Sequence, residues 1–139
     1  MTKKALRIAF DAHKEQVDKT GLPYIFHPFH IAEQMNDEVS VCVALLHDVV
    51  EDTEMTFEDL TALGISAEVV ETLKLLTHDN DSPYMAYIQR IKDSGNNIAI
   101  AVKLEDLQHN SDASRLDDVD ERMAANHAKY KAAMQLLLS

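Results

Sequence analysis

The sequence is poor in residues that cross-link or interrupt a chain: its 139 residues include one cysteine, three glycines, three prolines and no tryptophan. The single cysteine, Cys42, excludes an intramolecular disulfide, and its place in the apolar run VSVCVALL predicts a buried packing role in a reducing environment. Neither a Ser/Gly-rich linker nor an internal repeat is present. We therefore expect one domain that spans residues 1–139.

Basic residues are also scarce, with 13 Lys and Arg against 24 Asp and Glu and a net charge of −11. Such a charge repels polyanions, which disfavours binding to bulk nucleic acid or to an acidic membrane surface. No apolar run reaches the roughly 18 residues of a membrane span, and the start MTKKALRIAF does not resemble a secretory signal. These absences predict a cytoplasmic protein, in which local cations would have to receive any small anionic ligand.

Helical periodicity is what the sequence has in abundance. Leu6, Ala9, Phe10, His13 and Val17 recur at intervals of three and four residues. Turn and capping signals divide the rest of the chain into further helices, and no convincing strand pattern is present. The expected helices cover residues 3–19, a segment opening near Pro28, residues 39–50, Thr56 to Gly64, a segment from Ser66, a segment capped by Ser82 with Pro83 first, 97–110 and 119–138. The predicted fold class is all-α, a compact helical bundle.

The stretch ALLHDVVEDT places His47, Asp48, Glu51 and Asp52 at the end of an apolar helix. Spacings of three and four residues put these side chains on one continuous helix face. Alone, Glu51 and Asp52 would indicate a solvated helix end. Three neighbouring carboxylates repel one another, however, and burying one without a partner costs several kcal/mol or shifts its pKa. Because Lys and Arg are few nearby, a bound cation is the expected partner.

Two other segments can contribute to the same cation site. KLEDLQHN puts Lys103, Asp106 and Asn110 on one stripe of a later helix, and the turn GLPYIFHP projects His27 where the chain changes direction. Asp106 alone would pair with Lys103. Taken together, two histidines and two carboxylates from three segments form a mixed nitrogen and oxygen set that suits Mn²⁺, Fe, Co²⁺, Ni²⁺ or Zn²⁺.

These motifs resemble those of the HD-domain metal phosphohydrolases. The finer resemblance is to the hydrolase domain of the Rel/Spo-type stringent-response enzymes and their small stand-alone relatives, which degrade (p)ppGpp. The family motifs GxPYIxHP, ALLHDVVEDT and KLADRLHN stand here as GLPYIFHP from Gly21, ALLHDVVEDT from Ala44 and KLEDLQHN from Lys103. AHKEQ, which begins at Ala12, also matches, so that the resemblance covers about residues 10–115.

The resemblance implies an HD-type helical fold and one divalent metal, usually Mn²⁺. The implied metal ligands are His27, His47, Asp48 and Asp106. It further implies that Glu51 and Asp52 handle the attacking water, which agrees with general acid and base work beside a metal. The implied reaction is hydrolysis of the 3′-pyrophosphate ester of the nucleotide, without synthetase activity, because a synthetase domain does not fit in 139 residues.

Substrate contacts are expected around this centre. The candidates are Lys19, Tyr24, Lys103, Asn110 and Arg115. Asn110 is implied by the resemblance, whereas Tyr24 could equally be a packed ring and each cation could be an ordinary salt-bridge partner. The remaining histidines are expected to be structural or exposed: His13, His30, His78, His109 and His127.

Two departures from the family pattern affect the predicted substrate. The family commonly has a basic pair before its GxPY motif, where this chain has Asp18 and Lys19, and the Lys of its VTK motif is replaced by His78. Both changes weaken the prediction of guanine specificity. The alternatives are a phosphohydrolase or phosphodiesterase of another nucleotide, such as an NADPH-like molecule, and a non-catalytic nucleotide-binding module. Apolar residues 136–138 suit either the core or the face of a homo-oligomer.

Overall fold

The computed structural model describes residues 1–18, 20–114 and 121–139, and these residues form helices and no extended strand. The helices are α1 (Thr2–His13), α2 (Phe26–Glu33), α3 (Glu38–Leu46), α4 (Val49–Asp52), α5 (Phe57–Ala62), α6 (Ala67–Leu76), α7 (Tyr84–Asp93), α8 (Asn97–Ser114) and α9 (Glu121–Leu138). The expected all-α class is confirmed. Every helix in the described part of the chain is too short or too polar to cross a bilayer.

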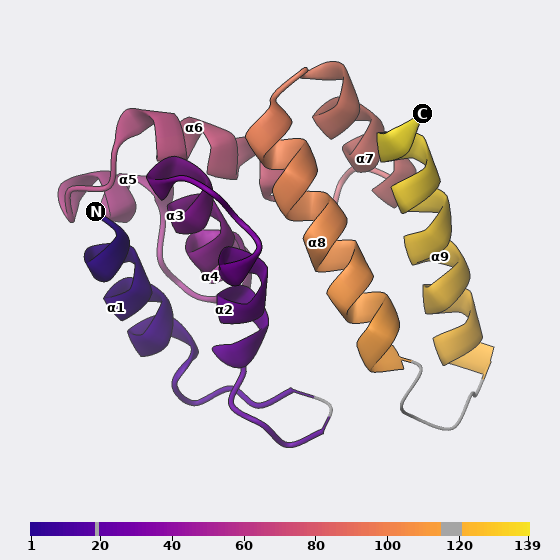
Figure 1. The fold of residues 1–139 in the computed structure, drawn as a ribbon, viewed down its shortest axis with the longest axis horizontal. Helices are drawn as coiled ribbons and strands as arrows, with labels where there is room; N and C mark the ends of the chain where they lie inside the picture. The colour runs from indigo at the N-terminus through magenta and orange to yellow at the C-terminus, as the bar shows by residue number, and fades with distance from the viewer. Residues whose placement is uncertain (19, 115–120) are drawn as a thin grey trace.

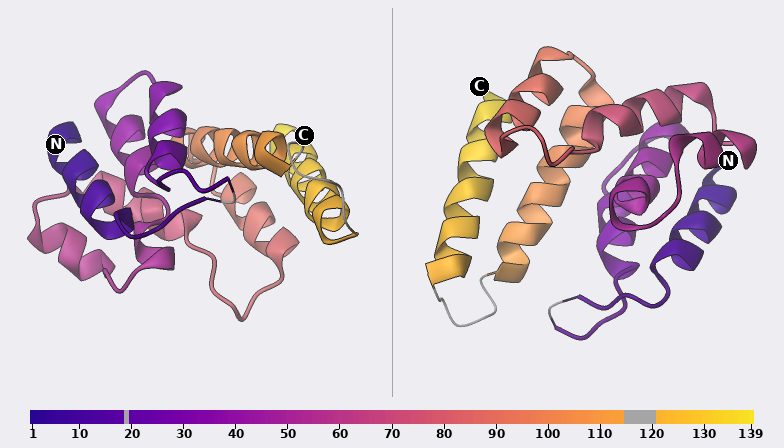
Figure 2. Two further views of the ribbon diagram at one scale, coloured as in Figure 1. Left: turned by 90° about the horizontal axis from the view of Figure 1, so that it is seen from below. Right: turned by 180° about the vertical axis from the view of Figure 1, so that it is seen from behind.

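Helices α3 and α8 organise the packing. Helix α3 packs against α1, α2, α6 and α8, while α8 packs against α2, α3, α6, α7 and α9. Figure 1 shows α8 between the group formed by α1 to α4 and the antiparallel helix α9, and Figure 2 shows the same arrangement from below and from behind. The candidate metal ligands on α2, on α8 and between α3 and α4 thus lie where α8 faces α2 and α3.

Helix α3 is central because it is apolar on nearly every side, as expected for its segment. Residues Cys42 to Leu46 are buried without interruption. At its start, Asp37 accepts a hydrogen bond from the Ser40 amide at 2.8 Å and satisfies a donor that the helix cannot pair itself.

The apolar residues at the end of α9 divide between core and surface. Leu137 is buried, whereas Leu138 is 72% exposed.

The first helix ends at His13, and the expectation that it runs to residue 19 is wrong. Residues beyond it form a turn in which the Asp18 amide donates to the Leu22 carbonyl and the Tyr24 amide donates to the Gln16 carbonyl. Gly21 lies within this turn at φ 85°, a conformation that costs glycine little. Cross-turn pairing therefore replaces the helical bonds that the apolar spacing predicted.

The helix expected over residues 39–50 is also divided. Helix α3 ends at Leu46 and α4 begins at Val49, so that His47 and Asp48 lie in the break between them. The chain carries its HD pair at these two positions, which keep right-handed backbone angles but belong to neither helix.

Other element boundaries follow the capping signals closely. Thr56 and Asp59 form the expected reciprocal capping box of α5, and Ser66 caps α6 through the Val69 amide. Helix α7 differs from the expectation, because Pro83 is itself the N-cap residue, with ψ 147°, and Ser82 lies outside the helix. Helix α8 continues to Ser114, beyond the expected end at residue 110.

Candidate metal centre

Four side chains from three parts of the chain converge on one point. Their potential ligand atoms all lie within 4.8 Å of one another. The group consists of His27 on α2, His47 at the end of α3, Asp48 before α4, and Asp106 on α8. Three of the four residues are buried and Asp48 is partly buried, so the set offers two imidazoles and two carboxylates in a poorly solvated position. Two carboxylates at this distance repel unless a positive charge separates them.

His47 has the geometry of a ligand rather than of a hydrogen-bonded core histidine. Its Nδ1 lies 2.6 Å from the Ala44 carbonyl oxygen, so that Nδ1 donates to this carbonyl and Nε2 faces the two carboxylates. Nε2 is buried 3.0 Å from Asp48 Oδ2 and 3.4 Å from Asp106 Oδ1. No hydrogen-bond partner of acceptable geometry for Nε2 is found within the described residues. A cation between these three groups would satisfy it.

His27 is held in the corresponding way. Its Nε2 lies 2.8 Å from Asp106 Oδ1 and 3.8 Å from Asp48 Oδ2, while its Nδ1 lies 2.6 Å from Nδ1 of His109. His109 also stacks on the His27 ring at 4.9 Å and on His30 at 4.5 Å. A partner on the outer nitrogen sets the tautomer of a metal-binding histidine. This contact of His109 was not expected from its sequence position.

Asp48 is anchored by Tyr24. The phenolic hydroxyl of Tyr24 donates to Asp48 Oδ2 at 2.5 Å across the turn before α2. Burial acts to raise the pKa of Asp48, but the neighbouring His47 outweighs it and holds that pKa below its usual range. Burial and the charge of Asp48 raise the pKa of Tyr24, which therefore remains a hydrogen-bond donor at neutral pH. Tyr24 thus orients a candidate ligand, in addition to any contact that it makes with substrate.

Asp106 shares its two oxygens between different partners. Oδ2 accepts from Lys103 Nζ at 3.0 Å, and Oδ1 faces both His27 and His47 and accepts from Asn110 Nδ2 at 3.3 Å. Burial acts to raise the pKa of Asp106, but the Lys103 ammonium and the histidines hold it well below its usual range. The carboxylate is therefore ionised and can serve as an anionic ligand. Lys103 and Asn110 both donate to Asp106, as expected from their places on one stripe of the helix.

Glu51 and Asp52 lie one turn beyond the candidate ligands, on α4. Burial and the charge of Asp48 raise the pKa of Glu51, and the same two causes raise that of Asp52. Oε1 of Glu51 accepts a hydrogen bond from the His78 amide at 3.1 Å. Both acids keep solvent-exposed surface.

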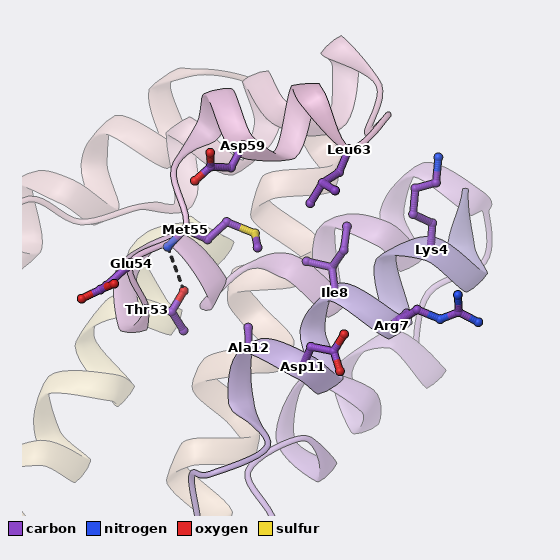
Figure 3. A pocket seen from close by; sticks show the side chains of 10 residues that line it. All are labelled: Lys4, Arg7, Ile8, Asp11, Ala12, Thr53, Glu54, Met55, Asp59 and Leu63. Carbon is purple, nitrogen blue, oxygen red and sulfur yellow. Dashed lines mark hydrogen bonds between the residues drawn. The ribbon is translucent and has the colours of Figure 1, made fainter.

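Two cavities differ in their relation to this cluster. A cavity of about 260 Å³ borders it and is lined by Val17, Asp18, Thr20, Tyr24, His27, His109, Asn110 and Tyr130. A larger one of about 640 Å³ lies between α1 and the segment that follows α4. Figure 3 shows that Ile8, Met55 and Leu63 converge on this larger cavity while Arg7 points outward, and no candidate metal ligand lines it. The smaller cavity is therefore the one that can present a ligand to the cluster.

The donor chemistry fits a divalent transition-metal ion. The two imidazoles each present Nε2 to the cluster while Nδ1 is held by a protein partner, and the carboxylates are ionised. Two expected substrate contacts, Lys19 and Arg115, lie outside the described residues. The contacts of Tyr24 with Asp48, of His109 with His27 and of His78 with Glu51 were missed, because no periodic spacing relates residues on different elements.

Comparison with known proteins gives a consistent relationship. No protein-family model matches the chain. The chain is 36% identical over 126 residues to the bifunctional (p)ppGpp synthase/hydrolase SpoT of Escherichia coli, a match that covers 78% of this chain and 17% of that protein. It is 32% identical over 142 residues to a GTP pyrophosphokinase of Myxococcus xanthus, covering 91% of this chain and 18% of that protein. The chain thus spans less than one fifth of these curated relatives.

A solved structure shares the fold. It is described as a metazoan ortholog of SpoT that hydrolyses ppGpp, and it matches 98% of this chain and 84% of its own with a TM-score of 0.80 and 22% identity. Fold and clustered side chains define the class as an all-α HD-type domain with a candidate metal centre. Within that class, the chain belongs to the Rel/Spo-like HD domains.

Proposed function

We propose that the chain is a metal-dependent phosphohydrolase that removes the 3′-pyrophosphate of (p)ppGpp. The observation that carries the proposal is the convergence of His27, His47, Asp48 and Asp106 within 4.8 Å, with Glu51 and Asp52 one turn away. The names of the relatives, which include (p)ppGpp synthase/hydrolase, support the choice of substrate. The partner of the site is accordingly a small anionic nucleotide.

The four clustered residues are proposed as the ligands of one divalent ion, Mn²⁺ before Fe, Co²⁺, Ni²⁺ or Zn²⁺. When bound, such an ion supplies Lewis acidity and a reactive water at neutral pH. Lys103 keeps Asp106 ionised, and Tyr24 holds Asp48 in place. Asn110 is proposed to contact substrate, which is supported by its bond to Asp106 and its place in the lining of the smaller cavity.

Glu51 and Asp52 are proposed to move the protons of the reaction. Water adds to the phosphorus attached to the 3′-oxygen, and the bond between this phosphorus and the 3′-oxygen breaks. The products are pyrophosphate and a nucleotide with a free 3′-hydroxyl. Glu51 takes the proton from the water. Its Oε1 already accepts a hydrogen bond from the His78 amide, so Oε2 is the oxygen that takes up the proton. Asp52, whose pKa is also raised, can deliver a proton to the leaving 3′-oxygen.

A second substrate class is favoured by one observation. Asp18 lines the cavity beside the cluster and adds a negative charge where the family commonly has a basic residue. A carboxylate there opposes a ligand with several phosphates. The alternative function is therefore hydrolysis of a less highly charged nucleotide by the same acids and ligands.

The test is a nucleotide panel with Mn²⁺ present, in which pyrophosphate and orthophosphate release are measured separately. The panel comprises ppGpp, pppGpp, GTP, ATP and NADPH, and the control is the Asp106→Ala variant. We expect pyrophosphate release from ppGpp with GDP as the second product, and no turnover by the control. Orthophosphate release from another nucleotide would favour the alternative, whereas binding without turnover would identify a non-catalytic module.

A further inference from the structure

The loop between α6 and α7 passes beside Glu51. The His78 amide in this loop donates to Glu51 Oε1 at 3.1 Å, which joins two residues 27 positions apart. Glu51 itself belongs to α4, a helix of only four residues. So short a helix holds its own residues weakly, because a single turn provides few internal hydrogen bonds. The orientation of Glu51 therefore depends on this contact from outside its own element.

The imidazole of His78 fixes the position of that amide. Its Nε2 lies 2.8 Å from the Ser82 carbonyl oxygen, which closes the loop on itself. Its ring stacks on Tyr87 with centroids 4.7 Å apart and planes inclined by 22°. The Tyr87 hydroxyl donates to the Leu76 carbonyl, and Arg90 donates to the Thr77 carbonyl at 3.2 Å. Contacts with both ends of the loop thus hold residue 78.

The same support reaches the candidate metal centre. Lys103 Nζ lies 5.2 Å from the centroid of the Tyr87 ring and 3.0 Å from Asp106 Oδ2. Tyr87 therefore contacts both the His78 ring and the Lys103 ammonium that donates to Asp106. A planar ring is required for this stack, and a flexible lysine at residue 78 would not provide it.

We propose that His78 is a positioning residue for Glu51 in the proposed hydrolysis. Its anchored ring sets the amide, the amide holds Oε1, and Oε2 is thereby directed toward the water that attacks the phosphorus. This inference rests on the proposed function. It assigns no contact between His78 and substrate, and residue 78 does not line the cavity beside the cluster.

The test is a double-mutant cycle of His78→Ala and Glu51→Gln, measured as kcat, KM and bound Mn²⁺. His78→Ala should lower kcat about tenfold with KM and metal content unchanged, since it weakens one hydrogen bond to a charged group. In the Glu51→Gln background, His78→Ala should change kcat by less than about twofold, because residues that act through one another are non-additive. His78→Gln, whose amide nitrogen can still reach the Ser82 carbonyl, should recover part of the activity.

Asp81→Ala is the matched control, since Asp81 is exposed in the same loop, and it should leave kcat unchanged. An undiminished loss from His78→Ala in the Glu51→Gln background would overturn the inference, as would a raised KM or a loss of Mn²⁺. If His78→Ala does not fold, the cycle is run with His78→Leu, whose side chain neither stacks as a ring nor bonds to the Ser82 carbonyl, and the same criteria apply. No turnover by the unaltered chain on any nucleotide would instead refute the proposed function.

Discussion

At the scale of single residues, the candidate centre depends on side chains that are shared between roles. Tyr24 lines the cavity and also donates to Asp48 Oδ2, and Asn110 lines the same cavity and donates to Asp106 Oδ1. Substitution of either residue would disturb a candidate ligand together with any substrate contact. Glu51 is free of this difficulty, because its described hydrogen bond runs to a backbone amide outside the cluster.

Glu51→Gln is expected to leave Mn²⁺ bound while kcat falls roughly a hundredfold or more, the scale of a general acid or base group. Glutamine keeps the size of the side chain and its carbonyl oxygen can still accept the His78 amide, but it does not take up a proton. Metal content by elemental analysis and kcat on ppGpp check the prediction. Turnover close to that of the unaltered chain would show that Glu51 is only a charge at the end of a helix.

At the scale of elements, the turn that contains Asp18, Thr20 and Leu22 bears on the specificity of the proposed reaction. Asp18 Oδ1 accepts hydrogen bonds from the amide and hydroxyl of Thr20 and from the Leu22 amide. Its pKa is lowered, chiefly by the bond from the Thr20 hydroxyl. The residue that departs from the family pattern therefore builds the turn in addition to placing a negative charge at the cavity.

Asp18→Asn separates these two roles. Asparagine keeps the accepting oxygen that holds the turn and removes the charge, so KM for ppGpp is expected to fall by about two- to fivefold with little change in kcat, as for a single exposed charge interaction. Asp18→Arg adds attraction to phosphates but loses the turn bonds, and it should lower KM only if the turn survives. Steady-state kinetics of both variants provide the measurement. A KM unchanged in both would show that Asp18 does not face the nucleotide.

At the scale of the whole molecule, acidic groups outnumber basic ones and the net charge is −11. The candidate centre differs from the rest of this acidic chain because its carboxylates are buried close together. Asp48 and Asp106 are brought together by elements far apart in the chain, and Lys103 balances one of them. A cation that binds the folded chain and not the unfolded one must stabilise it. The metal centre therefore makes a prediction about global stability as well as about activity.

Mn²⁺ at a hundredfold excess over its dissociation constant should stabilise the chain by about 2.7 kcal/mol, which corresponds to a rise in melting temperature of roughly 5–10 °C for a domain of this size. A chelator should reverse the rise. The control is Asp106→Ala, whose melting temperature should not respond to Mn²⁺. An equal rise in both proteins would place the binding at acidic groups elsewhere on the surface. Thermal melts with and without the ion distinguish these outcomes.

Local chemistry was enough to predict much of the fold. The Thr56 and Asp59 capping box, the Ser66 cap and the buried α3 segment follow from side chains and neighbours only a few residues apart, and all three stand in the structure. The candidate site residues were likewise marked by an acidic group at the end of an apolar helix. Caps and helical spacing relate residues a few positions apart within one element, and the sequence alone is therefore enough to predict them.

Tertiary structure decided what no local rule reaches. Between α3 and α4, Nε2 of His47 lies 3.0 Å from Oδ2 of Asp48, and both side chains meet His27 and Asp106 from other parts of the chain. Contacts between Tyr24 and Asp48, between His27 and His109, and between Glu51 and the His78 amide join residues 24, 82 and 27 positions apart. The sequence by itself determined which groups the protein has and which helices carry them. Only the tertiary packing of the helices and their connecting loops determined which of these groups meet, because such distances depend on the burial of every helix at once.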